Sequence, residues 1–350
     1  MEQAAAERAK PIVQGSITVT FVGKAWKWNE ADRTLAALSL GEHKVSEPAE
    51  NEIIVANTAI ALNPVDWKKI CAVKSSWKNG HIPGVDGAGI VVAAGSKVTL
   101  PLGTHVAYHQ DLARDGSFAQ YTTLAAYAAL VIPTELSDGV AASLPCPALT
   151  AWQSIEKVPT LANQDVLVIG GGGAVGRLLL QMAIERGFRT WTTASPQHEQ
   201  ELLQLGAAGV FDYHNENWRE ALQKALGGRK LFAAFDTMGE ANALTLEPLV
   251  GFNSHIVCIQ GRINENAAPA FTKAISQHEV ALNSIYGYGN EADWRLTRAA
   301  AARILHQVAI KTLSPSAIVP FAFEALPDAL TSLKEKKISG KFVAKLEFRR

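Results

Sequence analysis

Residues Val166–Gly176, VLVIGGGGAVG, join a short apolar run to a glycine-rich turn and to the start of an amphipathic segment. Within them Gly171, Gly173 and Gly176 have the spacing G-x-G-x-x-G. Between a buried strand and a helix, the first such glycine permits a tight turn, the second admits a pyrophosphate, and the third packs the helix against the strand. Free N–H groups at the start of the helix attract phosphate oxygens. The stretch therefore predicts a strand–turn–helix unit that binds a dinucleotide.

Downstream of this turn, apolar strand-like runs alternate with helix-like runs as far as about residue 289. Strands alternating with helices specify a parallel, doubly wound sheet. The strand-like runs are 165–170, 188–195, 209–213, 230–239 and 255–261, with 279–287 as a candidate sixth strand. Ahead of the turn, residues 137–158 begin with Ser-Asp, which can cap a helix, and continue with Ala and Leu at helical spacing.

The segments on either side of this alternating region have a β-like pattern. Short runs at 17–21, 52–62 and 88–95 are rich in β-branched residues and are separated by Gly, Pro, Asn and Asp. A long helix-like run at 293–310 is followed by strand-like residues 318–323 and 341–348 around a short helix at 325–337. Because this tail does not extend a parallel sheet, we expect it to rejoin the N-terminal β unit. The expected domains are 1–136, with 1–14 as a loose tail, then 137–289, and finally 290–350, which returns to the first.

The composition excludes several classes of protein. Apolar residues make up 48% and charged residues 19% of the 350, a globular balance that excludes disorder and coiled coils. The 33 Lys and Arg cancel the 33 Asp and Glu, so we expect neither nucleic acid nor a membrane surface as partner. The three cysteines lack CxxC spacing, which is typical of a reducing compartment. Since no apolar leader is present and no apolar run approaches ~20 residues, we expect a soluble cytoplasmic protein.

The residues after the second strand-like run indicate which dinucleotide is bound. A site for NAD normally has Asp or Glu about 20 residues beyond the glycine turn, where it binds the ribose. Residues 192–198, TTASPQH, contain no acid, and the first one after them is Glu199. Hydroxyls and a histidine can hold a 2′-phosphate that a carboxylate would repel, so the stretch favours NADPH over NADH. The alternative is a polar loop that only caps the next helix, and Ser195 fits both.

Eight short blocks occur in an order that resembles a known family. They are ALNPVDWK (61–68), IPGVDGAGIVVAAGSKV (82–98), GSFAQY (116–121), LPCPALTAW (144–152), the glycine turn, LGAAGVFDY (205–213), FDTMG (235–239) and SGKFV (339–343). The sequence resembles the medium-chain dehydrogenase/reductase superfamily, in its zinc-free quinone oxidoreductase-like and enoyl reductase-like branch. The resemblance implies an α/β fold in which a doubly wound Rossmann domain is inserted into a GroES-like β-barrel domain that the C-terminal tail completes. We also expect a homodimer.

The resemblance assigns roles to residues of the cofactor site. At the pyrophosphate it places Gly171, Gly173, Ala174, Val175 and Gly176. Beside the adenosine ribose and its phosphate it places Ser195, His198 and Tyr213. Around the nicotinamide it places Thr150, Asn63, Gln260 and Gly261, the last two through their backbone.

The positions that bind catalytic zinc in zinc-dependent relatives are changed in this chain. Where those relatives have a Cys and a His-Glu pair, this chain has Asn63 and Val85-Asp86. Cys146 alone resembles the third ligand, and one thiolate does not hold catalytic zinc. We therefore expect no metal, with Cys146 as a small buried residue. Three histidines of the β-like region have no metal-ligand spacing with one another either: His81, His105 and His109.

Lys68, in the block NPVDWK, is the side chain of greatest chemical interest. The matching lysine occurs in trans-acting enoyl reductases, and an ammonium there can stabilise an enolate or donate its proton. The other interpretation is a surface lysine or an ion pair with Asp66. We expect Asp66 itself to orient its loop through hydrogen bonds.

Together these features predict an NADPH-dependent oxidoreductase that transfers hydride, without a metal, to an apolar α,β-unsaturated carbonyl or a quinone. The substrate would lie between the two domains, at the carboxyl ends of the parallel strands. Lys68 and Asn63 are the candidate catalytic residues. Two alternatives stay open: a trans-acting enoyl reductase for carrier-bound polyketide chains, and a protein that binds NADPH without catalysis.

Overall fold

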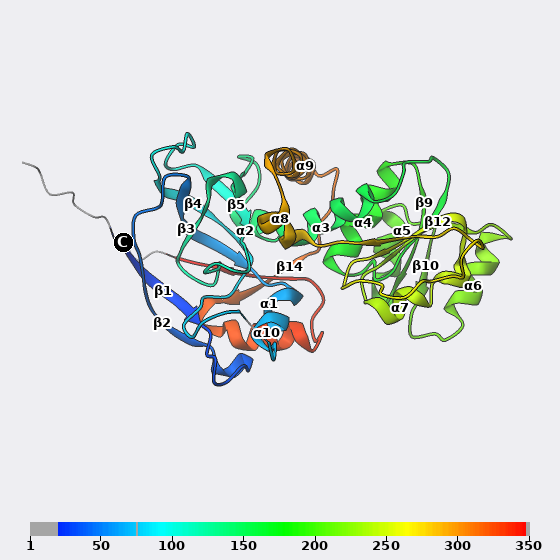
Figure 1. Cartoon of the computed structure of the whole chain (residues 1–350), viewed down its shortest axis with the longest axis horizontal. Coiled ribbons are helices and arrows are strands. Elements are labelled where there is room, and N and C mark those ends of the chain that lie inside the picture. Colours follow the sequence, from blue (N-terminus) through cyan, green and yellow to red (C-terminus); the bar gives the residue numbers. More distant parts are fainter. Residues whose placement is uncertain (1–19, 75, 348–350) are drawn as a thin grey trace, which may run out of the picture.

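The computed structural model describes residues 20–74 and 76–347, so the expected loose tail at 1–14 lies outside the described residues. Figure 1 shows two parts side by side along the longest axis of the molecule. One part is rich in β-strands and contains the first segments of the chain and its C-terminal return. The other contains a parallel sheet, which is green to yellow in the figure. The arrangement is the two-domain α/β fold expected from the sequence.

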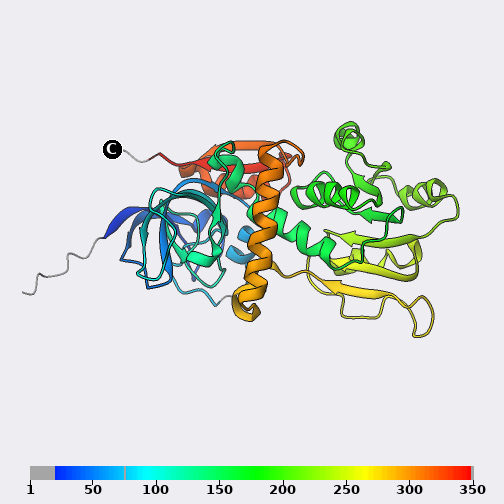
Figure 2. The same cartoon turned by 90° about the horizontal axis from the view of Figure 1, so that it is seen from above.

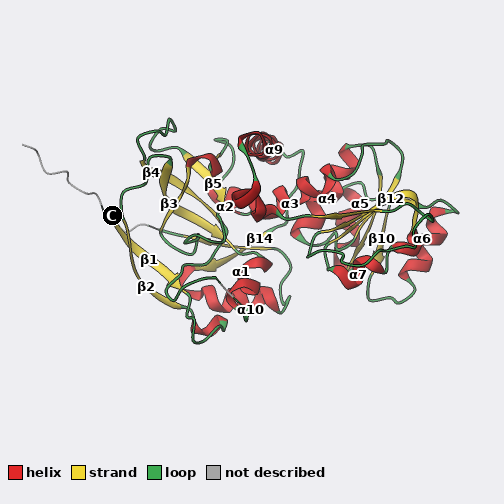
Figure 3. Ribbon diagram, in the orientation of Figure 1, coloured by secondary structure: helices red, strands yellow, loops and turns green. Residues whose placement is uncertain are grey.

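The parallel sheet has six strands in the order β10-β9-β8-β11-β12-β13, and every neighbouring pair is parallel. The chain starts at the centre and moves outward in both directions, so the doubly wound sheet is confirmed. Figure 3 shows helices on both of its faces. The strands are β8 (Asp165–Val168), β9 (Arg189–Ala194), β10 (Gly209–Asp212), β11 (Leu231–Asp236), β12 (Val250–Cys258) and β13 (Ser276–Glu279). The helices are α4 (Ala174–Glu185), α5 (Glu199–Gln204), α6 (Trp218–Leu226) and α7 (Glu240–Leu244).

The sixth strand lies earlier in the chain than residues 279–287, so that expectation is wrong. Strand β13 has the polar sequence SQHE and ends where the expected strand begins. The apolar residues after it, Val280 and Leu282, belong to the main core, and the chain there forms a short 3-10 turn and α8 (Ile285–Tyr288). An edge strand that is only half-buried needs no apolar run, which is why its sequence gave no signal.

The helical stretch 137–158 forms two helices rather than one. They are α2 (Asp138–Ala142) and α3 (Pro145–Glu156). The Ser137 hydroxyl accepts from the Val140 N–H at 3.4 Å, so the expected cap is present. Pro145 ends the first helix because a proline has no N–H and its ring clashes with the preceding turn, whereas at the first position of α3 it is tolerated.

The β-rich part contains a seven-stranded sheet and a separate hairpin. Strand β3 pairs with β4, β6 and β15, and the C-terminal tail rejoins this sheet as expected, with Val343 opposite Ala61. The sheet comprises β3 (Glu52–Ala61), β4 (Asp86–Ala94), β5 (His105–His109), β6 (Tyr121–Ala125), β7 (Leu130–Val131), β14 (Ile318–Ala322) and β15 (Lys341–Lys345). The hairpin consists of β1 (Phe21–Lys27) and β2 (Ser39–Val45). Helices α1 (Pro64–Ile70) and α10 (Leu326–Lys334) also belong to this part, and α2 packs on its sheet. The expected strand at 17–21 lies outside the described residues except at its end, where β1 begins.

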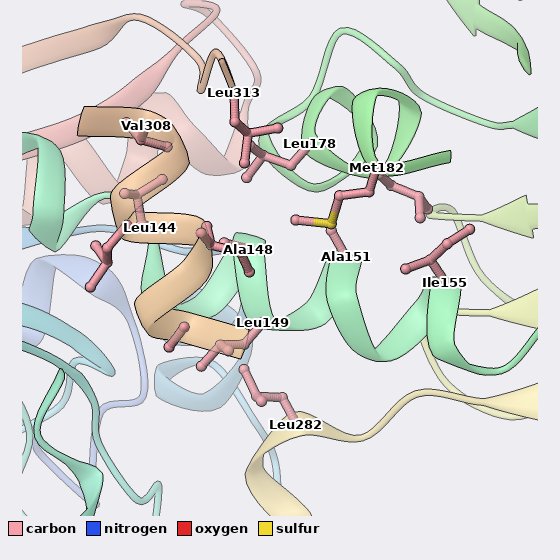
Figure 4. Close-up of a cluster of buried hydrophobic side chains, with 14 of the residues drawn as sticks. Leu144, Ala148, Leu149, Ala151, Ile155, Leu178, Met182, Leu282, Val308 and Leu313 are labelled. Carbon is pink, nitrogen blue, oxygen red and sulfur yellow. The ribbon is translucent and has the colours of Figure 1, made fainter. Parts of the chain in front are cut away.

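One apolar cluster extends through both parts. It includes Ala61 and Ala88 of the β-rich sheet as well as Val166 and Val168 of the parallel sheet. Figure 4 shows its centre, where side chains of α3 lie between those of α4 and of α9 (Glu291–Ala309). Figure 2 shows α9 running between the two parts. Within residues 20–74 and 76–347, no helix has the length and apolar character needed to cross a membrane.

Candidate functional site

The glycine turn between β8 and α4 contains two kinds of glycine. Gly170 has φ of +79°, a backbone conformation that favours glycine, so the tight bend lies one residue before the G-x-G-x-x-G motif. A Cβ on Gly171 would lie 2.2 Å from the Thr192 hydroxyl oxygen, and one on Gly176 would lie 2.2 Å from the carbonyl oxygen of Gly170. The packing of the protein itself therefore requires glycine at these positions.

Gly173 is different, because the protein around it leaves room for a side chain. A Cβ there would meet only the Gly170 carbonyl oxygen at 3.4 Å, and φ is an ordinary −83°. Gly173 is also the N-cap of α4, and no side chain caps that helix. The first N–H groups of α4, from Ala174, Val175 and Gly176, have no acceptor within the helix. A bare backbone beside these donors fits a pyrophosphate that approaches closely.

The acid-free stretch 192–198 covers the end of β9 and the residues that follow it. Some of its hydroxyl groups are buried, and one is accessible. Thr192 and Thr193 are buried and hold the glycine turn: the Thr192 hydroxyl donates to the Val168 carbonyl at 2.7 Å, and the Thr193 hydroxyl accepts from the Gly170 N–H at 3.1 Å. Ser195 keeps its hydroxyl free of any helix cap and lies 3.3 Å from the Tyr213 hydroxyl. The structure thus brings these two predicted residues together, and the cap that was the alternative use of Ser195 is absent.

His198 packs over the glycine turn. A Cβ on Gly172 would lie 2.6 Å from the imidazole carbon Cδ2 of His198. Its Nε2 lies 3.1 Å from the Ser339 hydroxyl, which belongs to the C-terminal return of the chain. The ring therefore connects the glycine turn to the β-rich part, a contact that the sequence did not indicate.

Lys68 connects the two parts at a second place. From α1, its Nζ donates to Oε1 of Gln260 at 2.5 Å, just beyond β12. Burial lowers the pKa of Lys68, and the ammonium of Lys336 lowers it further. The sequence assigned Gln260 to the nicotinamide side, so the structure joins two predicted residues. Next to Gln260, Gly261 has φ of +103° and open space around it.

Asp66 does not pair with Lys68, so the expected ion pair is wrong, whereas Lys68 is exposed, as the expectation of a surface lysine requires. The Asp66 carboxylate accepts from the Asn63 N–H at 2.6 Å and from the Val85 N–H at 3.2 Å, inside the capping box of α1. The expectation that Asp66 orients its loop is confirmed. Burial raises the pKa of this carboxyl group to about 7, against the lowering effect of the two N–H donors.

A buried polar cluster surrounds Asn63. The Asn63 amide donates to Asp86 at 2.9 Å, and its oxygen accepts from the Lys341 ammonium. The Asp86 carboxylate also lies 3.0 Å from Nδ1 of His109 and accepts from the Cys146 N–H at 3.1 Å. In the described ranges, Asp86, His109 and Cys146 form the one group of potential metal donors, with their ligand atoms within 4.8 Å of one another.

This cluster contains residues that the sequence did not assign. In the sequence, Lys341 belongs only to the block SGKFV, and His109 has no metal-ligand spacing with another histidine. Both reach Asp86 because β15 and β5 lie in the same sheet as β3 and β4. Cys146 is only partly buried as a residue, but burial of its thiol raises the thiol pKa, and the side chain of Thr150, one helical turn later, hydrogen-bonds to it.

Comparisons with known proteins agree with this layout. The Alcohol dehydrogenase GroES-like domain family matches residues 49–134. The 2-methylene-furan-3-one reductase of Solanum lycopersicum is 27% identical, over 97% of this chain and 83% of its own. Trans-enoyl reductase TOXD of Cochliobolus carbonum is 31% identical, over 54% of this chain and 67% of its own. The Escherichia coli quinone oxidoreductase complexed with NADPH superposes with a TM-score of 0.78 at 20% identity, over 92% of this chain and 100% of that one.

The fold and the glycine turn define a two-domain protein with a GroES-like domain and a nucleotide-binding type of parallel sheet. The chain belongs to the medium-chain dehydrogenase/reductase superfamily, in its quinone oxidoreductase and enoyl reductase-like branch, and is an oxidoreductase.

The two kinds of glycine predict different effects of alanine. Gly176→Ala should lower the free energy of unfolding by about 1–3 kcal/mol, because the new methyl group would collide with the Gly170 carbonyl. That loss outweighs the gain of about 1 kcal/mol in helix propensity. Gly173→Ala should cost no more than about 1 kcal/mol, because alanine caps a helix less well than glycine but has room here, and should weaken dinucleotide binding. Urea denaturation and cofactor titration of both variants test this, and equal losses of stability would contradict it.

Proposed function

We propose that the protein transfers hydride from NADPH to an α,β-unsaturated carbonyl or a quinone, and that it does so without a metal. The observation that carries this proposal is the bond between Lys68 and Gln260, which holds an ammonium group between the two parts of the molecule. A homodimer in the cytoplasm is the assembly and location that we propose for it.

The cofactor assignment is supported by two features of the site. The uncapped N-terminus of α4 and the bare backbone at Gly173 suit a pyrophosphate. Beyond the ends of β9 and β10, the side chains of Ser195, His198 and Tyr213 offer hydrogen-bonding groups and no carboxylate, which suits a 2′-phosphate. The solved Escherichia coli relative is described as a complex with NADPH. Bound in this way, the cofactor would supply the hydride.

The substrate class follows from the chemistry available to the side chains. When hydride forms a bond with the β-carbon of an enone, the electrons of the C=C bond move toward the carbonyl oxygen and give an enolate. The Lys68 ammonium can stabilise that negative oxygen, and its lowered pKa eases transfer of a proton to the α-carbon. Solvent is the alternative proton source. Asn63 would border the same space, with its amide fixed by Asp86.

The surroundings of the three potential metal donors support a mechanism without a metal. Asp86, His109 and Cys146 resemble a three-ligand set, but the Lys341 ammonium lies 3.6 Å from an Asp86 oxygen. As they stand, these residues do not fit a zinc ion.

One further observation favours a trans-acting enoyl reductase as the second candidate. Two further lysines lie near Lys68: Lys334 ends α10, and Lys336 follows it. Nζ of Lys334 lies 5.7 Å and Nζ of Lys68 lies 5.8 Å from the centre of the Trp67 ring, and the Lys336 ammonium lowers the pKa of Lys68. An acidic carrier protein or a phosphopantetheine arm would be attracted to such a surface. The relative from Cochliobolus carbonum is named a trans-enoyl reductase.

The cofactor preference is testable at Ser195. The unmodified protein should bind NADPH more tightly than NADH. Ser195→Asp should weaken NADPH binding at least about tenfold through repulsion of the 2′-phosphate, while Ser195→Ala, the neutral control, should weaken it less. Fluorescence titration gives all the dissociation constants. Equal affinity of the unmodified protein for both cofactors would refute the preference.

The role of Lys68 is testable with its neighbour as control. Lys68→Met should lower turnover of an enone by about tenfold to a thousandfold, because the enolate loses its cation. NADPH affinity and melting temperature should barely change, since the interaction matters mainly in the transition state. Lys69→Met, which removes the next charge on α1, should leave turnover unchanged. If Lys68→Met turns over a good enone at the normal rate, Lys68 has no part in the mechanism.

The proposed independence from metal predicts the composition of the purified protein. Elemental analysis should find far less than one zinc per chain, and prolonged treatment with a chelator should leave turnover unchanged. Adding zinc after chelation should give no increase. One equivalent of zinc whose removal abolishes activity would overturn the proposed mechanism.

A further inference from the structure

Lys341 brings a positive charge into the interior from the far end of the chain. Strand β15 pairs antiparallel with β3, so its first residue, Lys341, lies beside Asn63, which follows β3. Lys341 is only 5% exposed, and its ammonium donates to the Asn63 side-chain oxygen across 278 positions of sequence. Lysine is almost never buried to this extent unless it is paired, so the surroundings must provide a compensating charge.

Asp86 provides that charge. Its carboxylate is completely buried, and within the described residues its cationic neighbours are Lys341, at 3.6 Å, and His109, when that imidazole is protonated. The remaining contacts of Asp86 are with N–H groups of Asn63 and Cys146. A second buried carboxyl group, that of Asp66, lies in the same cluster. Without Lys341, this interior would hold carboxyl groups with no permanent cation.

The two charges also fix the Asn63 side chain in one orientation. Its NH₂ group faces the Asp86 carboxylate, and its oxygen faces the Lys341 ammonium. A flipped amide would place its oxygen against the carboxylate and its NH₂ group against the ammonium, and both contacts would be repulsive. The backbone N–H of Asn63 is held as well, by Asp66.

The same place contains three potential metal donors. Carboxylate, imidazole and thiol atoms of Asp86, His109 and Cys146 lie within 4.8 Å of one another, and three protein ligands are the number that hold a catalytic zinc. We propose that Lys341 is a positioning residue that acts as the built-in cation of this cluster: it fixes Asn63 and keeps a divalent metal away from Asp86, His109 and Cys146. The effect on catalysis through Asn63 rests on the proposed function, whereas the exclusion of metal does not.

Cobalt titration tests the exclusion of metal directly. Co²⁺ in a site with a cysteine ligand gives visible ligand-field bands and a thiolate-to-cobalt charge-transfer band. The unmodified full-length protein should show neither at one equivalent. Lys341→Met, which removes the charge but keeps much of the length, should bind one cobalt per chain with both bands. Adding Cys146→Ser to Lys341→Met should abolish the charge-transfer band.

Lys341→Arg is the matched control. It keeps a cation beside Asp86 and should exclude cobalt as the unmodified protein does. Two results would overturn the proposal. One is an unmodified protein that binds one cobalt per chain and shows the charge-transfer band that depends on Cys146. The other is a folded Lys341→Met protein that binds no cobalt.

Stability provides a second measurement in case Lys341→Met fails to fold. If Lys341 balances Asp86, the double variant Lys341→Met/Asp86→Asn, which lacks both charges, should melt at a higher temperature than Lys341→Met alone. A double variant that is no more stable than the single one shows that the two charges are not coupled, which also overturns the proposal.

Activity separates this inference from the proposed function. With NADPH and an enone, Lys341→Met should lower kcat about tenfold or more and change the Kd for NADPH less than threefold, because only the Asn63 end of the site is disturbed. An unmodified protein that is inactive with enones and quinones would refute the proposed function, while the cobalt and melting measurements would still decide the role of Lys341.

Discussion

The apolar seam along α3 is the constraint on which the arrangement of this molecule depends. Ala148 and Ala151 are small enough to bring α3 close to its neighbours, and Leu178, Met182 and Val308 fill the space around them. Because this cluster continues into both sheets, the two parts share one apolar cluster, in addition to the clusters that each part contains by itself. The bonds from Lys68 to Gln260 and from His198 to Ser339 both span the two parts, and their spacing is set by this seam. A packed cluster of this kind resists continuous deformation, so a relative movement of the two parts would have to preserve or repack it.

The fold was predictable because its signals are local. The apolar run before the glycine turn, the alternation of strands and helices after it, and the β-branched runs at both ends each reflect the face that a segment buries. The errors have local causes too. Pro145 divides the helical stretch 137–158 into two helices, and the polar edge strand β13 has no apolar pattern in its sequence. The precise domain boundaries, the homodimer and the cytoplasmic location stay predictions.

The site was predictable only where one segment forms it. The glycine turn is contiguous, and its donors follow from the start of a helix. The side-chain partners of Asn63 are Asp66, Asp86 and Lys341, and only the order of strands in the β-rich sheet brings Lys341 and His109 to Asp86. Sequence spacing therefore made His109 look isolated and left Lys341 without a role. The same limit applies to Lys68. Its neighbour in sequence, Asp66, accepts hydrogen bonds from the backbone instead, and the partner of Lys68 is Gln260, 192 positions away.

The segment from Ser339 to Lys341 has a consequence for how the molecule is made. Ser339 reaches His198 over the glycine turn, and two residues later Lys341 enters the cluster around Asn63. During synthesis, all the other strands of both sheets leave the ribosome before this segment, and β15 begins at its last residue. The parallel sheet can therefore form while the polar interior of the β-rich part still lacks its cation and its last strand. A chain that still lacks this segment would be partly folded, with the polar interior of its β-rich part incomplete, and such partly folded chains are what chaperones bind.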